Sequence, residues 1–312
     1  MVGRRACVKR KQRRGPPQLD IGAASRHKSG MVYIARAQTA QDFAEPVPPP
    51  QGRAARAWCD LRDGAAKSWM WTALALQDIR LRYRGSVLGP FWVTISTLVM
   101  AVSMGVIYAQ LFQIDVATYV PYLTIGLIVW QLISTLVSEG CETFLRADGI
   151  IQQVPIPFSV HVYRTVCRNF LVMAHSLAIV PLGYLFFAMP VGWHLLAVIP
   201  GFVLLALNGV WICLLLGLIS ARFRDVPPIV GAFLQVWFFL TPVIYPVAAL
   251  QNWRSLAEWN PFFAAIDVVR APLLGAAPLE TSWIVLLIST AIGSAFAFAM
   301  FARFRSRIAY WM

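Results

Sequence analysis

The chain has 312 residues, of which 58% are hydrophobic and only 13% are charged. Soluble domains average about 25% charged residues, so this composition excludes an ordinary soluble domain and predicts a membrane protein with several spans. The net charge of +13 does not indicate nucleic-acid binding, because 17 of the 27 Lys and Arg residues precede Val87 and most others lie between apolar segments. That distribution is typical of loops that face anionic lipid.

Residues 1–57 contain a basic segment, RRACVKRKQRRGPP, and a proline-rich segment, EPVPPPQGR. Such segments bury too little apolar surface to offset chain entropy, so we predict a disordered tail. It could bind anionic lipid or a partner. Alternatively, translation starts at Met31 and residues 1–30 are not made. We expect no cleavable signal peptide, because no apolar segment precedes residue 58. The first span then acts as the insertion signal.

Residues 58–86 are predicted to form an amphipathic helix in the membrane interface on the cytosolic side. Apolar side chains recur there at steps of three and four residues: Trp69, Ala73, Leu76, Ile79 and Tyr83. Tryptophan-rich amphipathic helices with flanking arginines lie among lipid headgroups. We expect Gly85 to end this helix and Pro90 to begin the next one.

We predict an all-α protein with six transmembrane helices: Val87–Phe112, Tyr119–Ser138, Arg164–Met189, Leu195–Ser220, Pro228–Val247 and Ser282–Ala302. Crossing a bilayer takes about 20 apolar residues, and no charged side chain lies at the centre of these segments. In this topology all Lys and Arg except Arg254 and Arg270 lie on one side. Both termini are therefore expected in the cytosol. The five cysteines show no C-x-x-C spacing, and we expect no disulfide.

The outer connection after the fifth span is long and contains QNWRSLAEWNPFFAAIDVVRAPLLG. Pro242 and Pro246 near the outer end of that span should break its helix, because proline removes a backbone donor. We expect two short helices, divided at Asn260–Pro261, that re-enter the outer leaflet. Irregular backbone at that depth must be shielded by protein or face water, so this region should lie beside a pathway.

Two inner loops, 139–157 and 221–228, carry charge and turn signals. Glu142 and Arg146 are spaced for an i,i+4 pair, Asp148–Gly149 indicates a turn, and Asp225 is a candidate N-cap. Without further context, both loops could be solvated segments that their charges hold inside.

The sequence contains no phosphate-binding loop and no cluster with metal-ligand spacing. The nearest string, Gly64 to Ser68, lacks the second glycine. We therefore expect no catalytic centre. Proton or sodium coupling is disfavoured because only His175 lies within a predicted span. Aromatic side chains in the spans could form interfacial belts or line a path and stack on sugars, and the sequence leaves both open.

Four motifs occur in order: RYRGSVLGPFW, a P-I-P after the charged inner loop, RDVPPIVGAFLQVWFFLTPVIYP and WNPFFAAIDVVRAPLLG. Over residues 68–312 the chain resembles the type-2 ABC transporter permeases. The resemblance is closest to the branch that exports lipid-linked polysaccharides such as O-antigen, capsule and teichoic acid. The C-terminal FRSRIAYWM is similar to the end of that branch, whereas residues 1–57 are longer than usual there.

The resemblance implies a permease subunit of an ATP-driven exporter in the inner (plasma) membrane. Two copies would form a homodimer around one path for a lipid-linked polysaccharide. A separate pair of ATPase subunits would bind ATP and Mg²⁺, so this chain would bind no cofactor and would not be an enzyme itself. Membrane lipids are expected partners and nucleic acids are not.

The resemblance also implies three groups of functional residues. A cytosolic gate would meet the lipid headgroup through Arg80, Arg82, Tyr83 and Arg84. Contacts with the ATPase would involve Glu142, Arg146, Asp148, Arg222, Arg224 and Asp225. A periplasmic gate would contain Trp253, Asn260, Pro261 and Phe262.

Alternative functions stay open. The chain could be a type-2 permease for a small molecule or drug, for which we expect an aliphatic lining of the path. It could be a non-transport membrane component of glycolipid assembly, or a channel. The last two lack support, because no motif-bearing polar loop and no filter-like ring of charges stands out.

Overall fold

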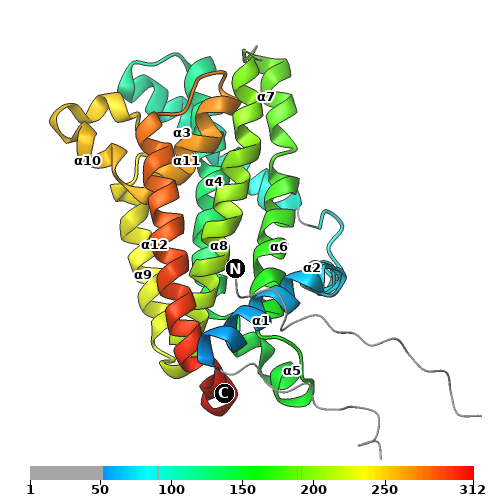
Figure 1. The fold of residues 1–312 in the computed structure, drawn as a ribbon. Coiled ribbons are helices and arrows are strands. Elements are labelled where there is room, and N and C mark those ends of the chain that lie inside the picture. The colour runs from blue at the N-terminus through cyan, green and yellow to red at the C-terminus, as the bar shows by residue number, and fades with distance from the viewer. Residues whose placement is uncertain (1–51, 90, 188, 191) are drawn as a thin grey trace, which may run out of the picture.

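The computed structural model describes residues 52–312 apart from 90, 188 and 191, and this part of the chain is a bundle of helices without strands (Figure 1). Within these described residues, five helical stretches are long and apolar enough to cross a membrane. They are Phe91–Phe112 (α3), Val116–Cys141 (α4), Ser159–Phe187 (α6 and α7), Trp193–Arg222 (η3 and α8) and Glu280–Trp311 (α12 to α13). The predicted disordered tail lies almost entirely outside the described residues, and so does Pro90.

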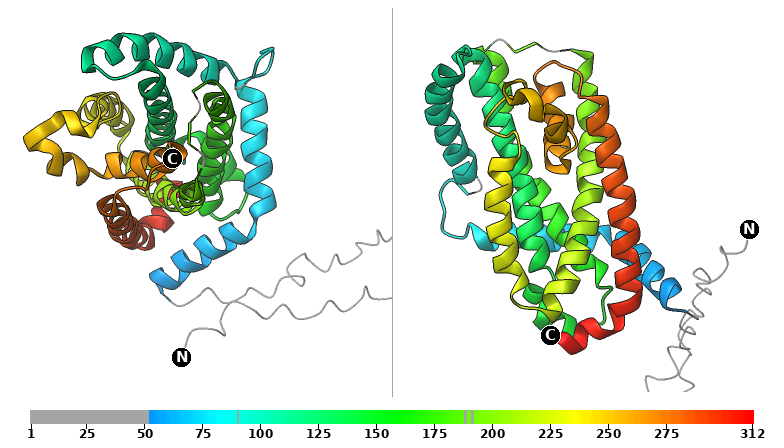
Figure 2. Two further views of the ribbon diagram at one scale, coloured as in Figure 1. Left: turned by 90° about the horizontal axis from the view of Figure 1, so that it is seen from above. Right: turned by 90° about the vertical axis from the view of Figure 1, so that its left-hand side faces the viewer.

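Helix α4 is the centre of the bundle, with α3, α6, α8, α9 and α11 packed around it (Figure 2). Lipid and side chains are equally apolar, so such helices associate through close packing, which small residues permit. Gly140 of α4 and Gly217 of α8 provide this closeness. A β-carbon on Gly140 would lie 3.1 Å from the α-carbon of Cys213, and one on Gly217 would lie 3.1 Å from the Gly140 carbonyl oxygen.

The third predicted span is interrupted, which the sequence analysis did not anticipate. Helix α6 (Ser159–Ser176) begins five residues before the predicted start at Arg164, and α7 (Ile179–Phe187) follows after a break. Pro181 accounts for the break, because it has no N–H to offer the Leu177 carbonyl four residues earlier. The amide of Val180 donates to that carbonyl instead, at 2.9 Å.

The fifth predicted span, Pro228–Val247, is only partly helical. Helix α9 (Val226–Leu240) has 15 residues. At 1.5 Å per residue it measures about 22 Å, less than the roughly 30 Å of a bilayer core. It stops just before Pro242, as the two prolines predicted.

Beyond this break, the outer connection forms η4 (Val247–Trp253), α10 (Arg254–Glu258) and α11 (Pro261–Leu273). The predicted pair of short helices is present, and the predicted division falls between them. Asn260 caps α11, because its side-chain oxygen accepts a hydrogen bond from the Phe262 amide at 2.9 Å. Pro261 occupies the first helical position, where its missing N–H costs nothing.

The predicted interface helix consists of two helices, α1 (Arg53–Ala66) and α2 (Ser68–Arg82), which lie across the bundle (Figure 1). The chain leaves helical geometry at Lys67. Helix α1 packs on α6 and α12, whereas α2 packs on α6. Trp69 is 70% exposed and Leu76 is 44% exposed. Much of the predicted apolar face is thus left uncovered by the protein itself.

Helix α1 is tied to the bundle by Asp60, whose side chain is fully buried. Its carboxylate accepts hydrogen bonds from the amides of Phe158 and Ser159 at 3.3 and 3.0 Å, and from Arg305 Nε at 2.7 Å. Asp60 thereby caps the N-terminus of α6 from another helix and also holds the end of α12.

Candidate functional site

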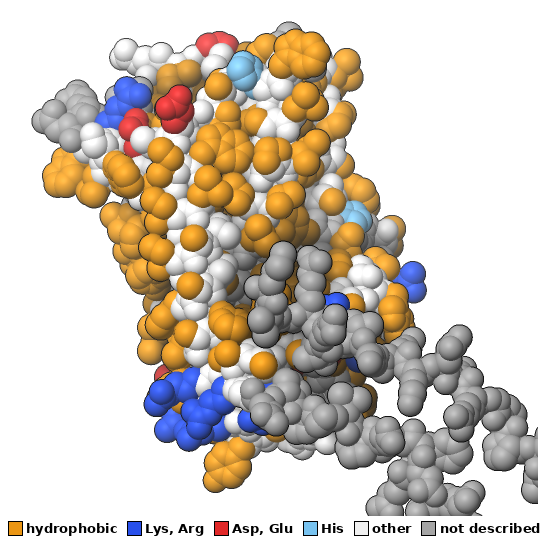
Figure 3. Space-filling view, viewed as in Figure 1, with side chains coloured by type: hydrophobic (Ala, Val, Ile, Leu, Met, Phe, Trp, Pro, Cys, Tyr) orange, Lys and Arg blue, Asp and Glu red, His pale blue; other side chains and the backbone are white. Residues whose placement is uncertain are grey.

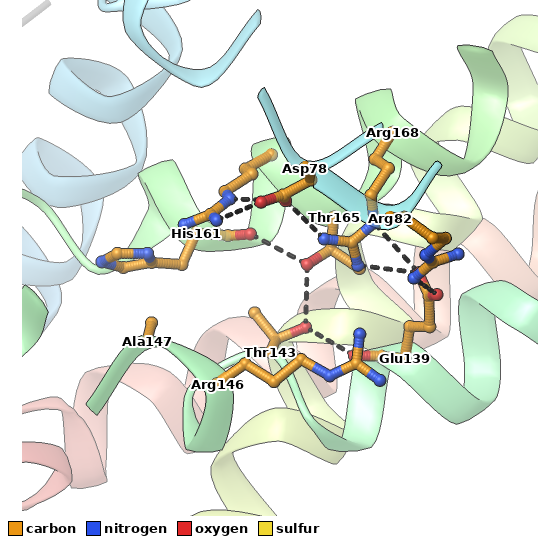
Figure 4. A pocket seen from close by; sticks show the side chains of 10 residues that line it. Asp78, Arg82, Glu139, Thr143, Arg146, Ala147, His161, Thr165 and Arg168 are labelled. Atoms are coloured by element: carbon orange, nitrogen blue, oxygen red, sulfur yellow. Dashed lines mark hydrogen bonds and ion pairs between the residues drawn. The ribbon is translucent and has the colours of Figure 1, made fainter. Parts of the chain in front are cut away.

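An inner cavity of about 280 Å³ lies where α2 meets α4, α6 and the loop after α4 (Figure 4). Its lining is dominated by charged and polar side chains. The lining residues are Asp78, Arg82, Glu139, Thr143, Arg146, Ala147, His161, Arg164, Thr165 and Arg168. We call this space the inner cavity, after the predicted topology, which places these residues on the cytosolic side.

Arg168 joins the two carboxylates of the inner cavity. Its Nη1 lies 2.6 Å from Asp78 Oδ2, and its Nη2 lies 2.7 Å from Glu139 Oε2. Glu139 also accepts from Arg82 Nη2 at 2.5 Å and from Asn169 Nδ2 at 2.8 Å. Arg164 forms a bidentate ion pair with Asp78. Helix α2 is thus bound by charge to both α4 and α6.

These ion pairs are poorly solvated, since Arg168 is 6% exposed and Glu139 is 8% exposed. Burial by itself would raise the pKa of Asp78, but hydrogen bonds and charge from Arg164 and Arg168 outweigh burial and lower it. Removing one partner from a buried pair leaves an uncompensated charge and costs about 3–5 kcal/mol. The attachment of α2 to the bundle therefore depends on every partner in this network being present.

His161 also lines the inner cavity and was not singled out from the sequence. It is 1% exposed, and within the described chain neither ring nitrogen has a hydrogen-bond partner. Glu139, which the sequence analysis placed in an inner loop, instead belongs to the last turns of α4. No local pattern in the sequence would have identified either residue, because their neighbours come from distant segments.

The structure divides the four residues of the predicted cytosolic gate. Arg82 lines the inner cavity and pairs with Glu139. Arg80 and Arg84 are exposed and do not line it, and Tyr83 is half-buried at the C-terminus of α2. The gate residues therefore do not form a single cluster.

The predicted ATPase-coupling residues lie on two loops at the end of the bundle that holds the C-terminus (Figure 1). Glu142 and Arg146 form the predicted i,i+4 ion pair. Asp148 begins α5 (Asp148–Gln153) and accepts from Gln152 Nε2 at 2.6 Å. Lys and Arg side chains gather at this end, over the lower parts of α9 and α12 (Figure 3).

The second loop follows α8. The Arg222 guanidinium lies 5.2 Å from the centre of the Trp311 ring, a cation–π contact with the C-terminus. Arg224 and Asp225 are exposed. Asp225 occupies the N-cap position of α9 as predicted, but its side chain makes no capping hydrogen bond. In that respect the capping prediction is wrong.

The predicted periplasmic gate lies at the opposite end. An outer pocket of about 420 Å³ is lined by Trp237, Leu240, Tyr245, Leu250, Trp253, Leu256, Ala257, Trp259, Asn260 and Pro261. Three of the four predicted residues meet there. Phe262 instead packs between Trp130 and Trp237, at ring-centre distances of 5.9 and 5.3 Å.

The irregular backbone between α9 and η4 is held by side chains of neighbouring helices. Tyr119 OH donates to the Ile244 carbonyl at 2.5 Å, and Arg270 Nη1 donates to the Pro242 carbonyl at 3.1 Å. Arg270 is 3% exposed, and its guanidinium lies 4.0 Å from the centre of the Tyr122 ring. Protein groups therefore shield this backbone, which is one of the two arrangements that the sequence analysis required.

A groove of about 470 Å³ runs between α3, α4 and α9. It contains Gln131, Ser134 and Ser138, which are exposed or half-buried on the mostly buried α4. The lining combines polar and aromatic groups: Thr97, Met100, Leu127, Trp130, Gln131, Ser134, Ser138, Gly231, Leu234, Gln235, Phe238 and Phe239. We call this feature the lateral groove.

Comparison with known proteins agrees with this architecture. Residues 71–274 match the model of the ABC-2 type transporter family. A protein of Myxococcus xanthus named "O-antigen export system permease protein RfbA" is 30% identical over 187 residues, which are 58% of this chain and 69% of that protein. A Klebsiella pneumoniae protein of the same name is 24% identical over 195 residues, 61% of this chain and 74% of that protein.

These matches confirm the resemblance to type-2 ABC permeases of the polysaccharide-export branch. The chain belongs to the ABC-2 type transporter family and is a multi-pass membrane permease.

Proposed function

We propose that this chain is the permease subunit of an ATP-driven exporter that moves a lipid-linked polysaccharide across the inner membrane. The proposal rests on the lateral groove. Polar side chains such as Gln131 and Gln235 can hydrogen-bond sugar hydroxyls, while Phe239, which is 68% exposed, offers an aromatic face. The names of the relatives, which refer to O-antigen export, support the same substrate class.

The groove is open on one side, so a second copy of the chain would be needed to enclose a path. Helix α3 forms one wall of the groove and is only 17% buried along its spanning part. Gln131 and Ser138 are exposed on α4, whereas most of that helix is buried. A homodimer that closes over these side chains would bury them along the path.

The proposed topology has six crossings and both termini in the cytosol. Helix α9 completes the fifth crossing together with residues 241–246, whose backbone is shielded by protein. Helices α10 and α11 re-enter the outer leaflet. In this arrangement residues 1–57 form a cytosolic tail, 58–86 the interface segment and 87–312 the permease domain.

A separate pair of ATPase subunits would bind ATP and Mg²⁺ and dock against the inner loops. The contacts proposed for it are Glu142, Arg146, Asp148, Arg222, Arg224 and Asp225. Arg80, Arg82, Tyr83 and Arg84 would face the headgroup of the lipid carrier. Trp253, Asn260, Pro261 and Phe262 would gate the outer end. The Glu142–Arg146 pair lies next to the inner cavity, which supports a mechanical link between the docking loop and α2.

The test is to fill the lateral groove. A Ser134→Trp variant places a large ring among the groove's polar side chains, and export of cell-surface glycan should fall strongly at normal expression. Ile292→Trp is the matched control, because Ile292 is 66% exposed on α12 and does not line the groove. Glycan export that survives Ser134→Trp, or a chain that never co-purifies with an ATPase, would overturn the proposal. Loss of drug efflux in place of glycan export would favour a small-molecule permease.

A further inference from the structure

We propose that the lateral groove selects glycans built from uncharged sugars and rejects glycans that carry a carboxylate or phosphate in each repeat. This inference rests on the proposed function, which requires only a polar and aromatic path. It adds that the charge of the glycan decides whether it can pass along the groove.

The helices that form the groove carry almost no charge. Helices α3 and α9 consist of uncharged residues throughout, and α4 has one charged residue, Glu139. Glu139 does not line the groove, and its carboxylate is already paired with Arg82 and Arg168. In the proposed two-fold homodimer, the second copy would add the same three helices. An acidic sugar would therefore find no cation on any helix that forms the groove.

The polar groups that line the groove are hydroxyls and amides. On α4, Gln131, Ser134 and Ser138 recur at steps of three and four residues, so they lie along one face of the helix. Thr97 on α3 and Gln235 on α9 supply the polar groups of the other two helices. Amides and hydroxyls can exchange hydrogen bonds with sugar hydroxyls, but they offer no full charge to compensate an anion.

Two of these hydroxyls are oriented as acceptors. Thr97 Oγ1 donates to the Val93 carbonyl at 2.8 Å, and Ser134 Oγ donates to the Gln131 carbonyl at 3.1 Å. Their remaining lone pairs can accept from a sugar hydroxyl but repel a carboxylate. The exposed ring of Phe239 acts in the same direction, because the face of an aromatic ring is negative. Since a charge without a partner is costly outside water, the groove penalises an acidic sugar.

The outer pocket has the same character as the groove. All ten residues that line it are uncharged, and α9 contributes to both spaces, through Trp237 in the pocket and Phe238 in the groove. On the neighbouring α10, Arg254 and Glu258 pair with each other at 2.8 Å. The inner cavity, by contrast, is lined by six charged side chains. A neutral glycan is therefore the substrate that both the groove and the outer pocket fit.

The experiment compares two polymers that differ only in charge. Inverted membrane vesicles that contain the full-length chain and its ATPase partner receive a lipid-linked galactan or a galacturonan of the same length and linkage. In the galacturonan a carboxylate replaces each C6 hydroxymethyl group. We expect ATP-dependent uptake of the galactan to be at least about tenfold faster. Methyl esterification of the galacturonan removes its charge and should restore uptake.

A Gln235→Lys variant tests the groove itself, because it adds a cation to the lining. The ratio of galacturonan uptake to galactan uptake should rise about tenfold. Val236→Lys is the matched control, since Val236 is the next residue of α9, is 58% exposed and does not line the groove. This control should leave the ratio unchanged. Both rates come from one vesicle preparation, so a lower amount of folded protein cancels in the ratio.

Equal uptake of the two unmodified polymers by the wild-type chain, or faster uptake of the galacturonan, would overturn charge selection and leave the proposed function intact. A ratio that stays constant in Gln235→Lys, or rises equally in Val236→Lys, would overturn the groove as the source of selection. Uptake of neither polymer would overturn the proposed function and this inference with it.

Discussion

The two ends of this bundle, which the predicted topology places inside and outside the cell, hold their peripheral segments in place with different chemistry. At the inner end, α2 is attached by ion pairs among Asp78, Glu139 and Arg168. At the outer end, irregular backbone is attached by hydrogen bonds to carbonyl oxygens, donated by Tyr119 and Arg270. The inner attachment depends on carboxylates that must stay ionised, whereas the outer attachment depends on backbone carbonyls, which do not titrate. Acid and the removal of a charge should therefore affect the two ends differently.

The largest expected effect is at the centre of the inner network. Arg168→Met removes the cation that both buried carboxylates share, so the free energy of unfolding should fall by about 3–5 kcal/mol. Thermal unfolding in detergent measures this, with Arg80→Met as a control, because Arg80 is exposed and makes no ion pair within the described residues. A loss no greater than that of the control would remove the network as the main attachment of α2.

The outer end should be less sensitive to the loss of its arginine. Arg270→Met removes a hydrogen bond to the Pro242 carbonyl and the contact with the Tyr122 ring. The nearby buried carboxylate of Asp267 loses a neighbouring cation, but it keeps hydrogen bonds from the Leu279 amide and the Ser282 hydroxyl. We expect a loss of roughly 1.5–3 kcal/mol. Arg254→Met is the control, since that side chain forms only an exposed pair with Glu258. If Arg270→Met cost more than Arg168→Met, the contrast between the two ends would be reversed.

Acid should weaken the inner end selectively. The folded-state pKa of Asp78 is lowered despite burial, because Arg164 and Arg168 favour the charged form. Its stabilising contribution is complete above its ordinary pKa, about 3.9, and is lost as the pH falls through the lowered value. The melting midpoint of the wild-type chain should therefore drop below about pH 4. The melting midpoint of Asp78→Asn should be lower at neutral pH and should change less as the pH falls. Parallel plots of melting midpoint against pH for the two proteins would contradict this expectation.

The features that could be predicted are those encoded within a few residues. Hydropathy located the five described stretches that are long and apolar enough to cross a membrane. Pro242 predicted the end of α9, and i,i+4 spacing predicted the Glu142–Arg146 pair. Pro181 encodes the break in the third span in the same local way.

The inner cavity could not be predicted, because its contacts join distant segments. Asp78 and Arg168 are 90 residues apart, and Arg82 and Glu139 are 57 residues apart. Their pairing depends on how the helices pack, which no local spacing reveals. The same holds for His161, which looks like any other residue near the start of an apolar helix until its neighbours are known.

The smallest effect on stability is expected at the Glu142–Arg146 pair. This pair can therefore show whether a residue matters for coupling to the ATPase without mattering for the stability of the bundle. Both side chains are partly solvated, at 37% and 51% exposure, so Glu142→Gln should change stability by only about 0.3–0.5 kcal/mol. If the ATPase transmits its conformational change through this loop, Glu142→Gln should reduce export far more than its small loss of stability would explain. The measurement is export at matched membrane levels beside the melting midpoint, with Glu258→Gln of the exposed outer pair as control. Equal, small effects of the two variants on export would mean that the inner pair merely caps a solvated loop.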